Sequence, residues 1–329
     1  MIQRRKIAGG IAALAAGLTG AMLAPAAFAA DPFPTKPIVI LVGFAPGGSS
    51  DTVARILAPR MADLLKQNVV IENRPGAGGN IASEALVRAP ADGHTIMLGT
   101  IGSLAVNQHL NKLSYNPVTD MAPLGMAIVF SNVLVVNASS DIRTLDDYIK
   151  AGRAEKSTMS FGSSGIGGSG HLAGEMFKIA AGLNNQHVAY RGGGPAMNDL
   201  LSGVLGSIFS SPTDAIQFLQ AGKLRAIATT GSKRLDVLPQ IPTIAESGYP
   251  GFEAANWYAF TAPQRTPPEV VQKLNSTINT VLNEPGIAAQ LRKLGLQPTP
   301  MSPEETGKYI RGESEKWGGV VRKAGLKAE

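Results

Sequence analysis

Cysteine is missing from the whole chain of 329 residues. A chain without thiols cannot form disulfides, cannot use cysteine as a nucleophile, and cannot carry a lipid anchor on a cysteine. The fold must therefore depend on its hydrophobic core alone, for which the 44% of apolar residues supply enough material.

Signatures of several enzyme classes are also missing. The chain has no Walker phosphate loop and no Gly-x-Ser-x-Gly nucleophile elbow. The glycine cluster Gly76–Gly79 fails the spacing of a dinucleotide fingerprint and follows the second predicted strand. The four histidines lack the spacing of metal ligands. These features predict neither a nucleotide, a metal nor another cofactor.

Residues 1–30 have the pattern of a secretory signal peptide. A basic start at Arg4–Lys6 precedes the small-residue apolar stretch Ile7–Leu23, and Ala27–Ala29 has the form that signal peptidase cuts. The alternative is a membrane anchor, which the cleavage site and the Ala- and Gly-rich run disfavour. Without the segment, 27 basic and 24 acidic residues leave a charge of +3 instead of +6. We expect a soluble periplasmic protein that does not bind nucleic acid.

Strand-like and helix-like segments alternate along the mature chain. The short apolar runs at 38–42, 69–72 and 94–98, with helical spacing between them, predict a βαβαβ unit and a parallel sheet. The apolar run 127–136 predicts one long strand that crosses to a second α/β series. We expect a return strand at 254–262 and three final helices, each started by proline. The predicted domains are 31–130 with 254–329, and 131–253.

Two glycine-rich loops follow predicted strands and open predicted helices. The first is Phe44–Asp51 and the second is Phe161–His171. The free N–H groups and the positive dipole end at a helix start form an anion site. Two such loops predict two lobes that close on one anionic ligand.

Five loops fall at the predicted carboxyl ends of strands, where open α/β sheets bind ligands. They are rich in glycine, which exposes backbone amides, and in hydroxyls that can donate to a carboxylate. The alternative is that each loop is only a tight turn. The hydroxyl residues concerned are Ser49, Ser50, Thr100, Ser103, Ser163, Ser164 and Ser169.

Five further side chains each leave two interpretations open. Arg191 could pair with a ligand carboxylate or form a salt bridge to Asp199 or Asp214. His171 could transfer a proton, but a structural hydrogen bond is the simpler role. Trp257 and Tyr258 could wall the cleft, but the core is the simpler place. For Asp51, we favour a charge that stabilises a helix start over a ligand contact.

Many ordered motifs resemble one family over almost all of the mature chain. It closely resembles the solute-binding proteins of tripartite tricarboxylate transporters, the Bug or TctC-like family. The motifs are Phe33–Ile38, Phe44–Gly48, Glu72–Asn80, Ala91–Gly93, His187–Ala196, Gln220–Arg225, Pro242–Gly248 and Ala262–Pro263.

The resemblance implies a bilobed Venus-flytrap fold with two Rossmann-like α/β domains joined by two crossing strands. It also implies a periplasmic receptor that holds a small carboxylate through backbone groups and water. Carried over by position, the contact residues are Phe44, Ala45, Gly47, Gly48, Ser49, Ala77, Gly78, Ser163, Ser164, Gly165 and Ser169. To these we add Thr100, Arg191 and Ser210 as candidates.

Ser210 stands where the family often has an aspartate, which would suit a ligand ammonium or hydroxyl group. We therefore hypothesise a ligand without an ammonium group, such as a dicarboxylate or an aromatic carboxylate. The expected protein is a monomeric receptor, with no catalytic step, that delivers its ligand to transporter subunits of the inner membrane or to a sensor. The alternatives are a lyase or hydrolase acting on an organic acid, and a secreted adhesin or scaffold.

Overall fold

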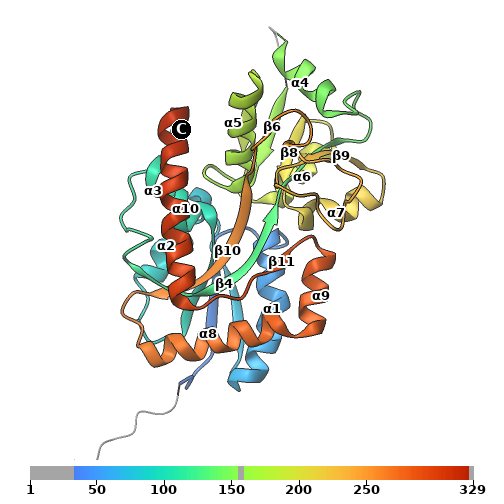
Figure 1. The fold of residues 1–329 in the computed structure, drawn as a ribbon. Helices are drawn as coiled ribbons and strands as arrows, with labels where there is room; N and C mark the ends of the chain where they lie inside the picture. The colour runs from blue at the N-terminus through green and yellow to red at the C-terminus, as the bar shows by residue number, and fades with distance from the viewer. Residues whose placement is uncertain (1–32, 155–158, 326–329) are drawn as a thin grey trace, which may run out of the picture. The chain divides into compact units, whose positions relative to one another are not determined.

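The computed structural model describes residues 33–154 and 159–325, so the predicted signal peptide lies outside the described residues. The described residues belong to one compact unit that begins at Phe33. Helices alternate with strands, and the strands in this part of the chain form one sheet of six and one of five (Figure 1). The predicted α/β class is confirmed.

The first sheet has the order β11-β4-β10-β3-β1-β2. Strand β1 (Ile38–Val42) runs parallel to β2 (Val69–Asn73) and β3 (Thr95–Thr100), as the βαβαβ pattern predicts. Strand β10 (Ala255–Pro263) is antiparallel to β3 and to β4 (Met121–Ser131) because the chain returns in the opposite direction. The expectation of a parallel sheet therefore holds for β1, β2 and β3 only. The short edge strand β11 (Gln297–Pro298) completes the sheet.

Helices cover both faces of the first sheet. Apolar residues of α1 (Ser49–Leu65) and α8 (Pro268–Asn283) pack on one face, against β1. Helices α2 (Asn80–Val87) and α10 (Pro303–Ala324) contribute to the cluster on the other face. Proline occupies the first turn of α8, α9 (Pro285–Lys293) and α10, as predicted. An irregular helical segment, Gly102–Val106, and the short α3 (Asn107–Leu110) were not predicted.

The second sheet has the order β7-β6-β8-β5-β9. Its strands are β5 (Val133–Asn137), β6 (Ser160–Ser163), β7 (Gln186–Ala189), β8 (Ser207–Ser210) and β9 (Leu224–Thr229). Helices α6 (Gly193–Leu201) and α7 (Pro212–Gln220) pack on one face. Helices α4 (Leu145–Arg153) and α5 (Ser169–Ala181) pack on the other, in a cluster that continues into the first sheet.

The predicted long strand 127–136 is two strands, one in each sheet, which meet at Asn132. The Asn132 amide donates to Thr230 Oγ1 over 2.9 Å, and the Thr230 amide donates to the Asn132 carbonyl over 2.9 Å. Thr230 Oγ1 also donates to the Ala254 carbonyl over 2.8 Å. The two segments that connect the sheets are thus joined by buried hydrogen bonds where they cross.

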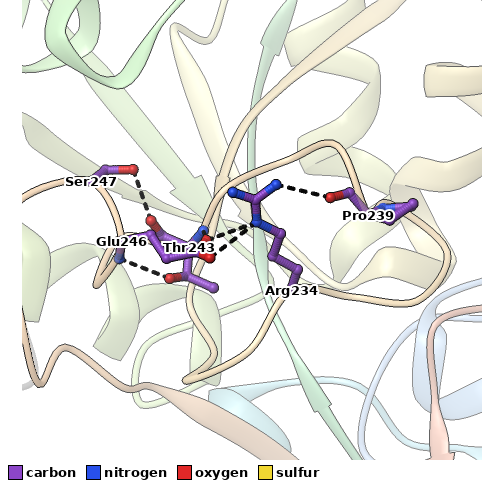
Figure 2. A network of polar contacts seen from close by, with 5 residues as sticks. All are labelled: Arg234, Pro239, Thr243, Glu246 and Ser247. Atoms are coloured by element: carbon purple, nitrogen blue, oxygen red, sulfur yellow. Dashed lines mark hydrogen bonds and ion pairs between the residues drawn. The ribbon is translucent and has the colours of Figure 1, made fainter.

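The connection from β9 to β10 is ordered by its own polar side chains (Figure 2). The Thr243 amide donates to Glu246 Oε2 over 2.8 Å, and the Glu246 amide donates back to Thr243 Oγ1 over 3.0 Å. Arg234 pairs with Glu246 at 2.9 Å and donates to the Pro239 carbonyl, while Ser247 Oγ donates to the Thr243 carbonyl. The motif Pro242–Gly248 is therefore a structural element of this connection.

Candidate functional site

A cavity lies where the loops of the two sheets meet. Seven of the predicted site residues line it: Phe44, Gly48, Ser49, Thr100, Ser164, Ser169 and Ser210. Twelve further residues line the cavity. Sequence reasoning named Ser50 as a hydroxyl donor and weighed Tyr258 as a wall of the cleft. It did not single out the other ten: Asn132, Gly168, Gly170, Gly193, Ala196, Ile208, Phe209, Ser211, Asp214 and Asn256. Of these, Ser211 and Asp214 could have been found by applying the strand-end rule to β8, whose end at Ser210 leads directly into α7.

Three helices begin at this cavity with glycine at the residue before the first turn. These are α1 after Gly48, α5 after Gly168 and α6 after Gly192. Glycine has no side chain that could accept a hydrogen bond from the first-turn amides, so no capping side chain occupies these amides. In α1 the Ser49 amide donates to Asp214 instead. The positive ends of three helix dipoles thus converge on one small volume. Among the described residues that line the cavity there is no Lys, Arg or His.

Two buried side-chain atoms in the lining, Thr100 Oγ1 and Asn132 Nδ2, have no hydrogen-bond partner in the structure. The residues are 5% and 1% exposed, respectively. The hydroxyl of a third buried residue, Ser49, interacts with the hydroxyl of Tyr258. A buried polar group without a partner costs about 1–3 kcal/mol. A ligand that supplied partners to Thr100 and Asn132 would recover this free energy, so these two atoms indicate a polar ligand.

Asp214 brings a carboxylate into the lining from the first turn of α7. A Cβ atom at Gly193 would lie 2.2 Å from Asp214 Oδ2, so the carboxylate packs directly against the start of α6. Burial raises the pKa of Asp214 to about 7, opposed by a hydrogen bond from the Ser49 amide. No ion pair to Asp214 is present among the described residues.

The first glycine loop is held in shape by Asp51. Its carboxylate accepts hydrogen bonds from the Gly47 amide at 2.9 Å, from Arg55 Nε at 2.8 Å and from Asn73 Nδ2 at 3.0 Å. Burial raises the pKa of Asp51, but these hydrogen bonds outweigh burial and hold it below its ordinary value. The favoured role of Asp51 at the helix start is confirmed. Because Gly47 donates to Asp51, its amide points away from the cavity, and Gly47 is absent from the lining.

Two histidines lie beneath the second glycine loop. His171 Nδ1 accepts a hydrogen bond from the Gly167 amide at 3.1 Å, and His187 Nε2 lies 2.8 Å from Ser163 Oγ. Burial lowers the pKa of His171 to about 4 and that of His187 to about 3, so both are neutral at pH 7. Ser163 is 0% exposed and faces His187 instead of the cavity. The structure places His171 in the predicted structural role.

Three other predicted residues, Gly78, Gly165 and Ala45, lie outside the lining and approach loops of the other sheet. A Cβ atom at Gly78 would lie 2.5 Å from the carbonyl of Ile166, so the backbone of this segment approaches the second glycine loop closely. A Cβ at Gly165 would lie 3.6 Å from Gly78 Cα, and one at Gly192 would lie 3.5 Å from the Ala45 Cβ. Ala77 is also outside the lining.

Arg191 is exposed and lies outside the lining. The described residues contain no ion pair from Arg191 to Asp199 or Asp214, and Asp199 instead accepts the Tyr190 hydroxyl at 2.6 Å. Neither of the two interpretations weighed for Arg191 has a contact in this structure.

The segment Gly165–Gly170 also has the spacing Gly-x-Gly-x-x-Gly between β6 and α5, which sequence reasoning overlooked. In dinucleotide-binding proteins an acidic residue about 20 positions later binds the ribose. Residues 176–198 contain no Asp or Glu. The pattern here serves the close approach of the loop to the cavity, and it does not favour a nucleotide.

Trp257 and Tyr258 alternate across β10. Trp257 is 0% exposed and Tyr258 is 5% exposed, and both belong to core clusters, as favoured. Tyr258 also lines the cavity. Trp257 and Trp317 both donate their indole N–H to Glu313 Oε2, at 3.1 and 3.0 Å. Burial raises the pKa of Tyr258 above its ordinary range, so it stays neutral at physiological pH.

Comparison with known proteins identifies the family. Residues 53–326 match the model of the tripartite tricarboxylate transporter family receptor, TctC. The chain belongs to this receptor family. It is 36% identical over 300 residues to protein BugT of Bordetella pertussis, covering 91% of this chain and 92% of BugT.

Two solved structures of similar proteins support the same assignment. The periplasmic binding protein BugD is 32% identical, with a TM-score of 0.86, covering 90% of this chain and 100% of BugD. The R. palustris protein Rpa4515, solved with adipate, is 34% identical, with a TM-score of 0.87, over 90% of this chain and 99% of that protein. The predicted bilobed periplasmic-binding-protein fold of this TctC-family chain is confirmed.

The described residues of this TctC-family chain contain neither a candidate membrane span nor a candidate metal cluster. No helix there is long and apolar enough to cross a membrane. No group of three or more His, Asp or Glu side chains there could hold a metal ion.

Proposed function

We propose that this chain is a periplasmic receptor that captures a small carboxylate in the cavity and delivers it to tripartite tricarboxylate transporter subunits. The observation that carries the proposal is the convergence of α1, α5 and α6, each with an uncapped glycine start. A carboxylate accepts hydrogen bonds from free amides and is stabilised by the positive helix ends. The adipate bound to Rpa4515 supports the same ligand class.

Within this function we propose roles for three polar side chains of the lining. Ser49 Oγ and Thr100 Oγ1 would donate to carboxylate oxygens, and Asn132 Nδ2 would donate from the point where the two sheets connect. Because Asn132 lies at that junction, ligand contact there would favour one relative position of the two lobes. We propose that the signal peptide is removed on export and that the receptor acts as a monomer without a catalytic step.

A matched pair of ligands tests the proposal. Isothermal titration calorimetry on the exported, processed protein should detect binding of at least one dicarboxylate from a panel of chain lengths and aromatic acids. The corresponding diamide has the same shape without the charge and should bind at least 100-fold more weakly. Equal binding of acid and diamide, or no binding across the whole panel at millimolar concentration, would refute the carboxylate site.

A further inference from the structure

Asp214 places a carboxylate in a cavity where three helix starts favour an anionic ligand. Its carboxylate lines the same cavity as the starts of α1, α5 and α6, and Gly193 lies directly against its Oδ2 atom. A second carboxylate that is ionised and lacks a proton to share would be repelled at this end of the cavity. The helix starts, which favour an anion, and Asp214, which repels one when it is ionised, therefore face the same ligand.

The surroundings of Asp214 leave part of its acceptor capacity unused. The Ser49 amide of α1 is the donor that reaches it, and no ion pair to it occurs in the described part of the chain. A carboxylate accepts about four hydrogen bonds. Tyr258 of β10 is the other titratable group among the lining residues that the structure describes. A ligand that donates a hydrogen bond is thus favoured where Asp214 lies.

We infer that Asp214 makes the receptor selective for carboxylates that also carry a hydrogen-bond donor, either a hydroxyl or an ammonium group. This rests on the proposed carboxylate-binding function and goes further by naming the ligand subclass. The hypothesis of a ligand without an ammonium group depended on Ser210 alone. The structure shows that an acid lines the same cavity four residues later in the chain, which removes the reason for that hypothesis.

Matched ligands with and without the donor test this inference on the exported protein by calorimetry at pH 8. The pairs are succinate with malate and aspartate, glutarate with 2-hydroxyglutarate and glutamate, and phenylacetate with mandelate. In whichever series binds, the donor-bearing ligand should bind at least tenfold more tightly than its partner. Malate and aspartate separate the hydroxyl from the ammonium group on the same carbon skeleton.

The variant Asp214→Asn should reduce this ratio to within about threefold, because an amide oxygen is a weaker acceptor than a carboxylate. The control Asp141→Asn makes the same charge change at an exposed residue outside the lining and should keep the wild-type ratio. Lowering the pH from 8 to 6 should also shrink the wild-type ratio, because the pKa of Asp214 near 7 lies between these values. The Asp214→Asn ratio should stay constant over the same range.

Two results would overturn the inference and leave the carboxylate receptor intact. One is equal affinity for both members of every pair that binds, and the other is an Asp214→Asn variant that keeps the wild-type ratio. If no acid in any series binds, the proposed function fails and the inference fails with it.

Discussion

The cavity and the segment Pro242–Gly248 both contain Ser, Thr and acidic residues, but the hydrogen bonding of these residues differs. In the segment, Thr243, Glu246 and Ser247 all form hydrogen bonds within a few residues of one another (Figure 2). In the cavity, Thr100 is buried, yet its hydroxyl has no partner. The difference separates a segment whose polar groups order the backbone from a cavity in which a polar group remains available to a ligand.

Glu246 in the segment and Asp214 in the cavity differ in the direction of their pKa shifts. Hydrogen bonds from the Thr243 amide and from Arg234 lower the pKa of Glu246, whereas burial raises the pKa of Asp214 to about 7. Glu246 is therefore adapted to being charged in the folded protein, and Asp214 is not. The comparison predicts that changes in the cavity alter binding and that changes in the segment alter stability.

The largest expected effect is on binding, from Ser169→Asp at the first residue of α5. A fixed carboxylate at this helix start would occupy the anion site and repel the ligand, so affinity should fall more than 100-fold, or about 2.7 kcal/mol. Thermal stability should fall modestly, because Ser169 Oγ donates to Asn132 Oδ1 at 3.3 Å and a carboxylate cannot, while the favourable position of an acid at a helix N-terminus offsets part of this loss. The control Ser302→Asp makes the same change at the start of α10, outside the lining, and should bind normally. Normal binding by Ser169→Asp would contradict the site.

Thr243→Val should lower stability and leave binding unchanged. It removes the hydroxyl that accepts the Glu246 amide at a residue that is 0% exposed. The expected loss is about 1–2 kcal/mol of unfolding free energy, seen as a fall of roughly 2–4 °C in Tm. Calorimetry below the transition should give the wild-type Kd. A weakened Kd would mean that this segment also shapes the cavity.

Thr100→Val, in contrast to Thr243→Val, should raise the stability of the ligand-free protein and weaken binding. Valine has nearly the shape of threonine and removes a buried hydroxyl without a partner, so the ligand-free protein should gain about 1 kcal/mol. Binding of the carboxylate should weaken by up to about tenfold, because one donor is lost. Chemical denaturation without ligand and calorimetry with ligand measure the two effects. A loss of stability in the ligand-free variant would show that the hydroxyl has a partner after all.

The smallest expected effects are on pH dependence. The folded pKa of Glu246 is depressed, so its contribution to stability is present above the unfolded pKa and lost as the pH falls through the folded pKa. Glu246→Gln should therefore lower Tm by a degree or two at pH 7, and the difference from the wild type should disappear as the pH falls through the folded pKa of Glu246. The folded pKa of Asp214 is raised, so the acid stabilises less as the pH rises from 4 to 7. Asp214→Asn should thus raise Tm at pH 8 and show no difference near pH 4.

The sequence was sufficient to predict most helices and strands, but not to predict where individual side chains point. Periodicity and glycine punctuation predicted β1, α1 and α5 closely, because these depend on local patterns. Residues 127–136 are apolar throughout, so no local signal marked the change of sheet at Asn132. Ser163 and Ser164 are neighbours of the same type, and only tertiary packing decides that the first faces His187 and the second faces the cavity.

The candidate site was predicted at the level of loops. The glycine loops before α1 and α5 do reach one cavity, because each follows the carboxyl end of a strand in its own sheet and the loops of the two sheets meet there. Three other lining residues lie on or between the strands that connect the two sheets: Asn132, Asn256 and Tyr258. The strand-end rule applies to loops only, so it could not predict them. Asp214 was considered only as a partner for Arg191, and the strand-end rule was not applied to β8.

The approach of Gly193 to Asp214 has a consequence for how relatives of this protein can diverge. A side chain at 193 would collide with the carboxylate at 214 in its present position, so a change at either position alters the space available to the other. A methyl group at 193 would displace the acid, and the acid keeps its present position only beside glycine. The two positions should therefore vary as a pair, and the pair should divide the family's members by the ligands that they accept.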